Sequence, residues 1–155
     1  MGLPPFQRFF DEHRHAVHRF LVATAGRDEA DDCFQETFIA ALRAYPRLDP
    51  DSNLGGWVLT IAHRKAIDAH RARGRRATPT AEPPEHAAPA PPDGFDPALW
   101  RLVRELPPKQ RAAVVLRHVA DLPHREIAGV IGCSEDAARR NLHEGLSRLR
   151  KEWTR

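Results

Sequence analysis

The residues with the most specific chemistry lie near the end of the chain, where residues 124–142 read HREIAGVIGCSEDAARRNL. Small Ala128 would let two helices cross closely, Gly132 would permit a corner, and Ser134 is a good N-cap for a second helix. The outward side chains of that second helix would be Glu135, Arg139, Arg140 and His143, with Asn141 near their edge. Arginine can bond guanine bidentately and asparagine can bond adenine, so this helix-turn-helix is a candidate reader of the DNA major groove. A helical bundle can mimic the pattern, so a purely structural role is the alternative.

A second candidate contact with nucleic acid is the basic segment 63–76, which carries six Lys and Arg residues and one acid. On a helix, Arg64, Asp68 and Arg71 share a face that could follow phosphates. Trp57 and polar residues of the preceding loop could stack on or hold unpaired bases. The alternative is a solvated helix end whose cations lie near the negative end of the helix dipole.

A third feature is an acidic face on the predicted helix 28–45. It consists of Asp31, Asp32, Gln35 and Glu36, opposite an apolar stripe that includes Leu42. DNA would repel this face, so it is either a solvated surface or a docking surface for a basic protein partner.

The elements that must position these residues are all predicted to be helices. Apolar residues recur at spacings of three and four, and the alternation typical of strands is absent. The predicted helices cover residues 6–25, 28–45, 54–73, 97–105, a segment that starts at 107–108, 124–131, and 134 to about 152.

Proline divides the chain. Residues 77–94 carry six of its 14 prolines and no lysine or arginine, which predicts an extended acidic linker. The expected organisation is a domain at 4–76, a linker at 77–96 and a domain at 97–155. The net charge is +2 over residues 1–76, −4 over 77–98 and +5 over 99–155. Two basic parts separated by an acidic one suggest two contacts with a polyanion, although a GC-rich genome alone would also enrich arginine.

Several functional classes are disfavoured. None of the 155 residues belongs to an apolar run of about 18, and the N-terminus lacks the apolar core of a secretory signal. We therefore expect a cytoplasmic protein without a membrane span. Cys33 and Cys133 form no metal-binding pair, and the histidines show no ligand spacing. We expect no metal, no cofactor and no enzymatic activity.

Taken in this order, the three features resemble those of an extracytoplasmic-function sigma factor of bacterial RNA polymerase. Residues 32–38 resemble the helix that binds core polymerase, and residues 57–71 resemble the promoter-melting helix. Residues 106–111, followed by 126–128 and 132–135, resemble the domain that binds the upstream promoter element.

The resemblance implies an all-α fold of two small helical domains, similar to sigma regions 2 and 4, joined by the Pro-rich linker. It implies an alternative sigma factor that binds core RNA polymerase and directs promoter-specific transcription initiation. Such a protein recognises the −35 element as duplex DNA and melts and captures the −10 element. The implied partners are core polymerase, through its β′ clamp helices and β flap, and promoter DNA, with an anti-sigma factor as a further candidate.

Residue roles follow from the matched positions. The resemblance assigns core-polymerase binding to Asp31, Asp32, Gln35 and Glu36. It assigns −10 DNA binding to Asp51, Ser52 and Asn53 of the loop 49–56, and to Trp57, His63, Arg64 and Arg71. It assigns −35 DNA binding to Ser134, Glu135, Arg139, Arg140 and His143. The family often has Arg-Asn where this chain has His63 and Arg64.

The competing function is an ordinary transcriptional regulator that uses the same helix-turn-helix on duplex DNA without polymerase. Such a regulator has no use for both the acidic face at 31–36 and the basic helix that follows it.

Overall fold

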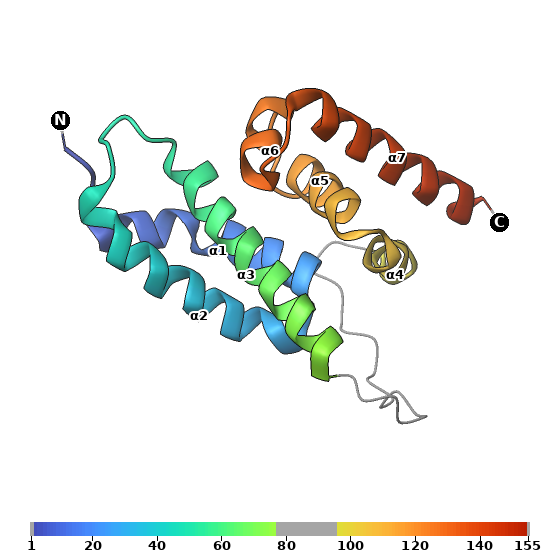
Figure 1. Ribbon diagram of the computed structural model, residues 1–155, viewed down its shortest axis with the longest axis horizontal. Coiled ribbons are helices and arrows are strands. Elements are labelled where there is room, and N and C mark those ends of the chain that lie inside the picture. Colours follow the sequence, from blue (N-terminus) through green and yellow to red (C-terminus); the bar gives the residue numbers. More distant parts are fainter. Residues whose placement is uncertain (1, 77–95, 155) are drawn as a thin grey trace.

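The computed structural model describes residues 2–76 and 96–154, and these contain helices and turns but no strand (Figure 1). The predictions of an all-α fold and of two helical domains are confirmed. The predicted linker at 77–96 lies outside the described residues except for Asp96. The helices are α1 (Phe6–Ala25), α2 (Arg27–Ala44), α3 (Leu54–Arg76), α4 (Pro97–Glu105), α5 (Pro108–His118), α6 (His124–Ile131) and α7 (Glu135–Trp153), with a short 3-10 turn at Tyr45–Arg47.

Helices α1, α2 and α3 form the first group, and a single glycine makes the turn between the first two. Gly26 has a φ of +88°, in the region where a side chain is strained, and it ends α1 just before α2 begins. Asp28 and Glu29 lie in the first turn of α2, where the helix dipole favours acidic side chains. The chain therefore reverses at Gly26 and packs α1 against α2.

An aromatic cluster forms the core of this first group. The ring of Phe9 is fully buried, and its centroid lies 5.2 Å from that of Tyr45, 5.8 Å from that of Trp57 and 6.2 Å from that of Phe38. These residues belong to α1, the 3-10 turn, α3 and α2. The Phe9 ring therefore packs against every other element of the first group.

One apolar residue of α2 does not reach this core. Leu42 was predicted in the buried stripe, but it is 54% exposed. Ala41 occupies the inward position, and the next residue lies about 100° further round the helix. Since α1 and α3 both pack against the side of α2 that carries Ala41, no described helix covers Leu42.

Helices α4 to α7 form the second group, and local signals set their ends. Asp96 caps α4 by accepting hydrogen bonds from the backbone N–H groups of Ala98 (2.8 Å) and Leu99 (3.3 Å). Gly132 adopts a left-handed conformation after α6, and the Ser134 side chain accepts from Ala137 N at the start of α7. The predicted corner and N-cap of the helix-turn-helix are therefore confirmed.

Close contact between α5 and α7 depends on a missing side chain. Gly145 is buried in the middle of α7, and a Cβ there would lie 2.9 Å from a methyl group of Val114 on α5. A larger residue would push the two helices apart.

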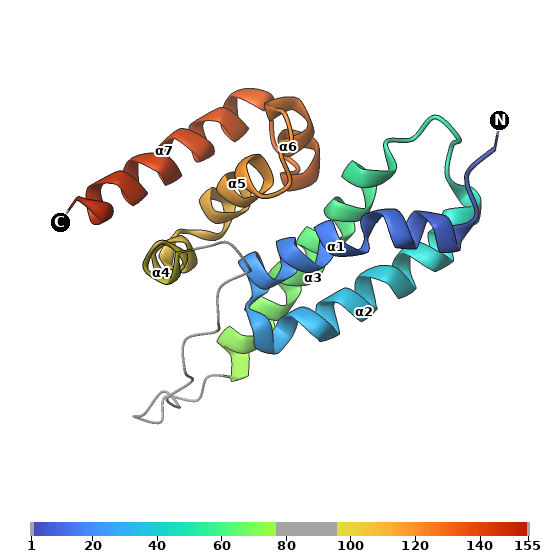
Figure 2. The same cartoon turned by 180° about the vertical axis from the view of Figure 1, so that it is seen from behind.

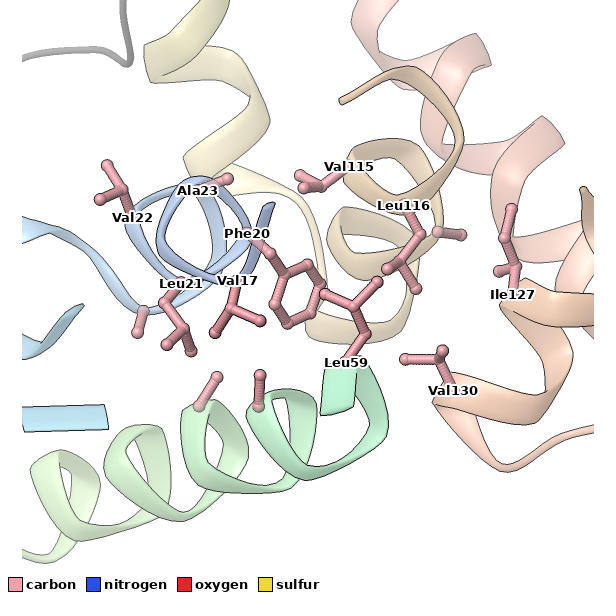
Figure 3. Packing of buried hydrophobic residues seen from close by; sticks show 14 of the residues in the cluster. Val17, Phe20, Leu21, Val22, Ala23, Leu59, Val115, Leu116, Ile127 and Val130 are labelled. Carbon is pink, nitrogen blue, oxygen red and sulfur yellow. The ribbon is translucent and has the colours of Figure 1, made fainter. Parts of the chain in front are cut away.

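The two groups of helices also pack against each other, which the sequence analysis did not predict. Helix α3 contacts α6, and α1 contacts α5. Figure 3 shows Phe20 of α1 and Leu59 of α3 pointing toward Leu116 of α5 and Val130 of α6. All four side chains are buried, so one hydrophobic cluster runs through both groups.

We expect Leu116→Ala to lower the free energy of unfolding by about 2–5 kcal/mol, because it removes buried methyl groups and leaves a cavity. Leu42→Ala is the matched control and should change stability by less than about 0.5 kcal/mol, because that side chain is exposed. Urea denaturation followed by circular dichroism measures both. Equal effects of the two substitutions would contradict the burial of Leu116.

Candidate nucleic-acid and protein interfaces

The five residues assigned to −35 DNA lie together on one exposed stripe at the start of α7. Ser134, Glu135, Arg139, Arg140 and His143 are all exposed, while Ala138 and Leu142 on the opposite face are buried against the second group. Helix α7 runs along the outer edge of that group (Figures 1 and 2). The stripe is therefore accessible, and its position after a helix-turn-helix corner is the geometry that inserts a helix into a major groove.

Two side chains of this stripe form an ion pair with each other. Arg139 Nη2 donates to Glu135 Oε1 at 2.9 Å, in an ion pair whose side chains are 60% and 46% exposed. A pair this exposed contributes little to stability and can be exchanged for a DNA contact. Arg140 and His143 are exposed beside it.

Asn141 is half-buried between the exposed Arg140 and the buried Leu142, so it lies at an edge of the outward face. Its Nδ2 donates to Ala137 O at 3.0 Å, and the residue lines a cleft between the two groups of helices. The sequence indicated the edge position but not the cleft.

The structure contains the predicted acidic face of α2. Asp31, Asp32, Gln35 and Glu36 are all exposed. His18 Nε2 lies 3.6 Å from Asp31 Oδ1, between side chains that are at least half exposed. Helix α2 lies on the side of the first group that faces away from α5, α6 and α7 (Figures 1 and 2). The second group therefore leaves this face open to a protein partner.

The loop assigned to base capture is held by its own side chains and by the second group. Asp49 Oδ1 accepts from Asp51 N at 2.9 Å, and Asn53 Oδ1 accepts from Gly56 N at 3.1 Å, at the start of α3. The other end of the same amide faces the second group, since Asn53 Nδ2 donates to Glu126 Oε1 of α6 at 3.0 Å. Ser52 is half-buried, and Asp51 and Asn53 are exposed.

The α3 residues assigned to −10 DNA are divided between surface and interior. Arg64 and Arg71 are exposed on one face together with Asp68, as predicted. Trp57 is half-buried in the aromatic cluster, with its ring 6.5 Å from that of Tyr45.

His63 is only 5% exposed, and its ring packs against Phe20 with the centroids 6.3 Å apart. Burial lowers the pKa of His63, and the nearby charges of Arg64 and Lys109 lower it further. The assigned surface is thus only partly accessible while the two groups are in contact.

Two arginines lie at this contact, and the sequence analysis did not predict that either of them would join the two groups. Arg111 Nη1 donates to Thr24 O near the end of α1 at 3.1 Å, and its Nη2 donates to Arg104 O (2.8 Å) and Leu106 O (2.9 Å). The Arg104 guanidinium lies over Gly26, where a Cβ would approach it to 2.9 Å. Burial lowers the pKa of Arg111 to about 10, and the charge of Arg104 adds to this effect.

The described residues contain neither a metal-binding cluster nor a membrane-spanning helix. No group of three or more His, Cys, Asp or Glu side chains in residues 2–76 and 96–154 is arranged to hold a metal ion. Within the same ranges, no helix has the length and apolar character needed to cross a membrane.

Comparisons with known proteins agree with this geometry. The family model of Sigma-70 region 2 matches residues 9–76, and that of Sigma-70 region 4 matches residues 97–149. The RNA polymerase sigma factor CarQ of Myxococcus xanthus is 32% identical over 94% of this chain and 87% of its own length. The ECF RNA polymerase sigma factor SigD of Mycobacterium tuberculosis is 35% identical over 90% of this chain and 72% of its own length.

Two solved structures share the fold. The sigma factor RpoE of Bartonella quintana, in complex with the anti-sigma factor NepR, superposes with a TM-score of 0.76 over 94% of each chain at 20% identity. CnrH, in complex with the cytosolic domain of CnrY, superposes with a TM-score of 0.73 over 96% of this chain and 87% of CnrH at 21% identity. The family matches and the identity to CarQ and SigD show that the chain belongs to the extracytoplasmic-function subfamily of sigma-70 factors, which direct transcription.

Proposed function

We propose that this sigma factor binds core RNA polymerase and directs initiation at promoters whose −35 element it reads as duplex DNA and whose −10 element it helps to melt. The observation that carries the proposal is the exposed stripe of α7, where Arg139, Arg140 and His143 follow a capped helix-turn-helix corner. In this proposal residues 4–76 serve polymerase and −10 binding, residues 97–155 serve −35 binding, and residues 77–96 join them.

Binding to polymerase is proposed for the acidic face of α2. This face carries two aspartates, a glutamate and a glutamine, and Ile39, which is 50% exposed, lies beside it. Protein interfaces combine an apolar centre with a charged rim, and complementary charge raises the rate of encounter. A basic helical surface of polymerase is the partner that fits this combination.

The −10 step requires the two groups of helices to separate. His63 is buried beside α5, so it cannot contact a base while the groups are packed together, and Asn53 would have to give up its exposed hydrogen bond to Glu126. The acidic face of α2 and the stripe of α7 are exposed in the same packed arrangement. Polymerase docking on the α2 face can therefore precede the separation, and the separation itself must be driven by contacts that only the separated form makes.

A protein that stabilised the packed arrangement would inhibit initiation. The solved structures of RpoE with NepR and of CnrH with CnrY make an anti-sigma factor the natural candidate for this chain as well. By linkage, a partner that binds only the packed form shifts the population toward it in proportion to its concentration and affinity.

The polymerase contact is tested by Gln35→Ala combined with Glu36→Ala, which should weaken binding to core polymerase about tenfold, or about 1.4 kcal/mol. The matched control is Gln7→Ala with Glu12→Ala, which removes the same side-chain types from an exposed part of α1. Fluorescence titration with core polymerase measures both affinities. If both double variants bind as well as the unchanged protein, α2 is not the docking surface.

The −35 contact is tested with Arg139→Ala and Arg140→Ala on a promoter selected from a randomised DNA library by the reconstituted holoenzyme. Loss of a base-reading arginine should weaken binding by about 1–3 kcal/mol and relax the sequence preference at one position. Loss of a phosphate contact should weaken binding to all sequences alike. Arg150→Ala, at the far end of α7, is the control. Unchanged promoter affinity in both variants would rule out groove reading by this stripe.

Separation of the two groups is tested by cross-linking Ala16→Cys to Ala120→Cys. Both residues line a cleft of about 190 Å³ between α1 and the turn after α5, and neither belongs to a proposed contact. Cys133→Ser removes the more accessible native thiol, while Cys33 can stay because burial raises its pKa to about 11.

A short, cleavable bismaleimide should join the two new thiols in the free protein and reduce promoter-dependent transcription at least tenfold. Cleaving the linker with a reductant should restore transcription to the level of the untreated variant. Full activity of the cross-linked protein would show that initiation does not need the separation. Protein treated with a monofunctional maleimide controls for modification alone.

A further inference from the structure

A cleft of about 460 Å³ lies where the two groups of helices meet, and of its lining residues only His63 and Arg71 belong to the proposed contacts with polymerase and promoter. Its wall is formed by the end of α1, the middle of α3, the start of α5 and Asn141 of α7. Much of the wall is apolar, with Ala66 and Ile67 on one side and Pro107, Pro108 and Ala112 on the other. This volume is within the range of pockets for small molecules, which are found preferentially at domain interfaces.

The charge in this cleft has one sign. The basic side chains His63, His70, Arg71, Lys109 and Arg111 line it, and the described lining residues include no carboxylate. Glu144 lies close by, and its Oε2 accepts from Gln110 Nε2 at 3.2 Å. The buried Nε of Arg111 has no hydrogen-bond partner within the described part of the chain. No carboxylate among the described lining residues therefore offsets the charges of Lys109 and Arg111.

The position of Lys109 supports a role other than stability. It is exposed in the first turn of α5, where the helix dipole disfavours a cation and favours an acid. Pro107 and Pro108 carry no N–H and Arg111 N donates to Pro107 O, so at this helix end the N–H groups of Lys109 and Gln110 are the ones without a partner in the helix. Lys109 therefore destabilises its own helix while it adds positive charge to the cleft. A residue that breaks a local rule in this way is expected at a binding site.

We propose that this cleft binds a small amphipathic anion, in which a carboxylate, sulfonate or phosphate is attached to an apolar body. The charged group would lie between Lys109 and His70, and the body would pack on Ile67 and Pro108. Residues of both groups form the cleft, so the ligand binds the packed arrangement and stabilises it. The consequence for transcription rests on the proposed function, whereas the binding itself does not.

The binding experiment uses the full chain and 8-anilinonaphthalene-1-sulfonate, a fluorescent aromatic sulfonate. We expect saturable binding of one dye per chain. Lys109→Glu should weaken it at least tenfold without lowering the thermal stability of the protein, because an acid suits the first turn of α5. Lys151→Glu makes the same charge change on an exposed part of α7 that does not line the cleft, and it should bind the dye like the unchanged protein.

Three further probes identify the chemistry. The uncharged parent, N-phenyl-1-naphthylamine, should bind at least tenfold more weakly than the sulfonate, which separates an anion site from an apolar patch. Inorganic phosphate and a single-stranded oligonucleotide should not displace the dye at equal concentration, which separates an amphipathic ligand from phosphate alone or from DNA. Equal binding to Lys109→Glu and Lys151→Glu, or displacement by the oligonucleotide, would overturn the proposal.

Stabilisation of the packed arrangement is measured with the Ala16→Cys, Ala120→Cys protein. The dye should raise the rate of cross-linking, and the cross-linked protein should bind the dye more tightly than the uncross-linked one. Identical affinities would overturn this coupling. Neither measurement contains polymerase or promoter, so a failure of the proposed function would leave both results intact.

Discussion

The arrangement of this sigma factor depends on apolar burial between its two groups of helices. Phe20 and Leu59 on one side meet Leu116 and Val130 on the other, and none of the four is more than 4% exposed (Figure 3). Separation would return these side chains to water, which is unfavourable in proportion to the apolar area exposed. Burial of these side chains therefore favours the packed arrangement, and the separation proposed above requires compensating contacts elsewhere.

Polar contacts at the same interface set its geometry more than its strength. Arg111 reaches Thr24 O of α1, but its guanidinium has no carboxylate partner there, and burial beside Arg104 lowers its pKa. Asn53 and Glu126 are joined by one exposed hydrogen bond. Desolvated cations oppose the apolar gain. These polar contacts therefore favour one relative orientation of the helices and add little to the free energy that holds them together.

Sequence reasoning located the helices well because their ends are set by local chemistry. The glycine turn at Gly26, the corner at Gly132 and the cap at Ser134 are each decided within a few residues. The sequence also predicted which faces of α2 and α7 are exposed, because the 3.6-residue period of a helix is likewise a local property.

What the sequence could not provide is the contact between segments far apart in the chain. The burial of His63 depends on α5, the hydrogen bond of Asn53 depends on α6, and the cleft that Asn141 lines exists because the two groups are packed together. The prediction that Leu42 is buried was wrong for a related reason, because an apolar residue at the edge of a stripe is buried only if a neighbouring helix covers it. The spacing of apolar residues along the sequence does not indicate which distant segments will lie next to each other.

The missing side chain at Gly145 has a mechanical consequence. Glycine in the middle of a helix lowers helix stability by about 1 kcal/mol relative to alanine, yet here it lets α7 rest directly on Val114. Glu135 lies ten residues before this contact, a distance of about 15 Å along the helix axis. Arg139 and Arg140, which the proposed function places against DNA, lie six and five residues before it, about 9 and 8 Å along the same axis. The close fit at Gly145 limits how far α7 can tilt relative to α5, and it therefore limits changes in the orientation of these two arginines.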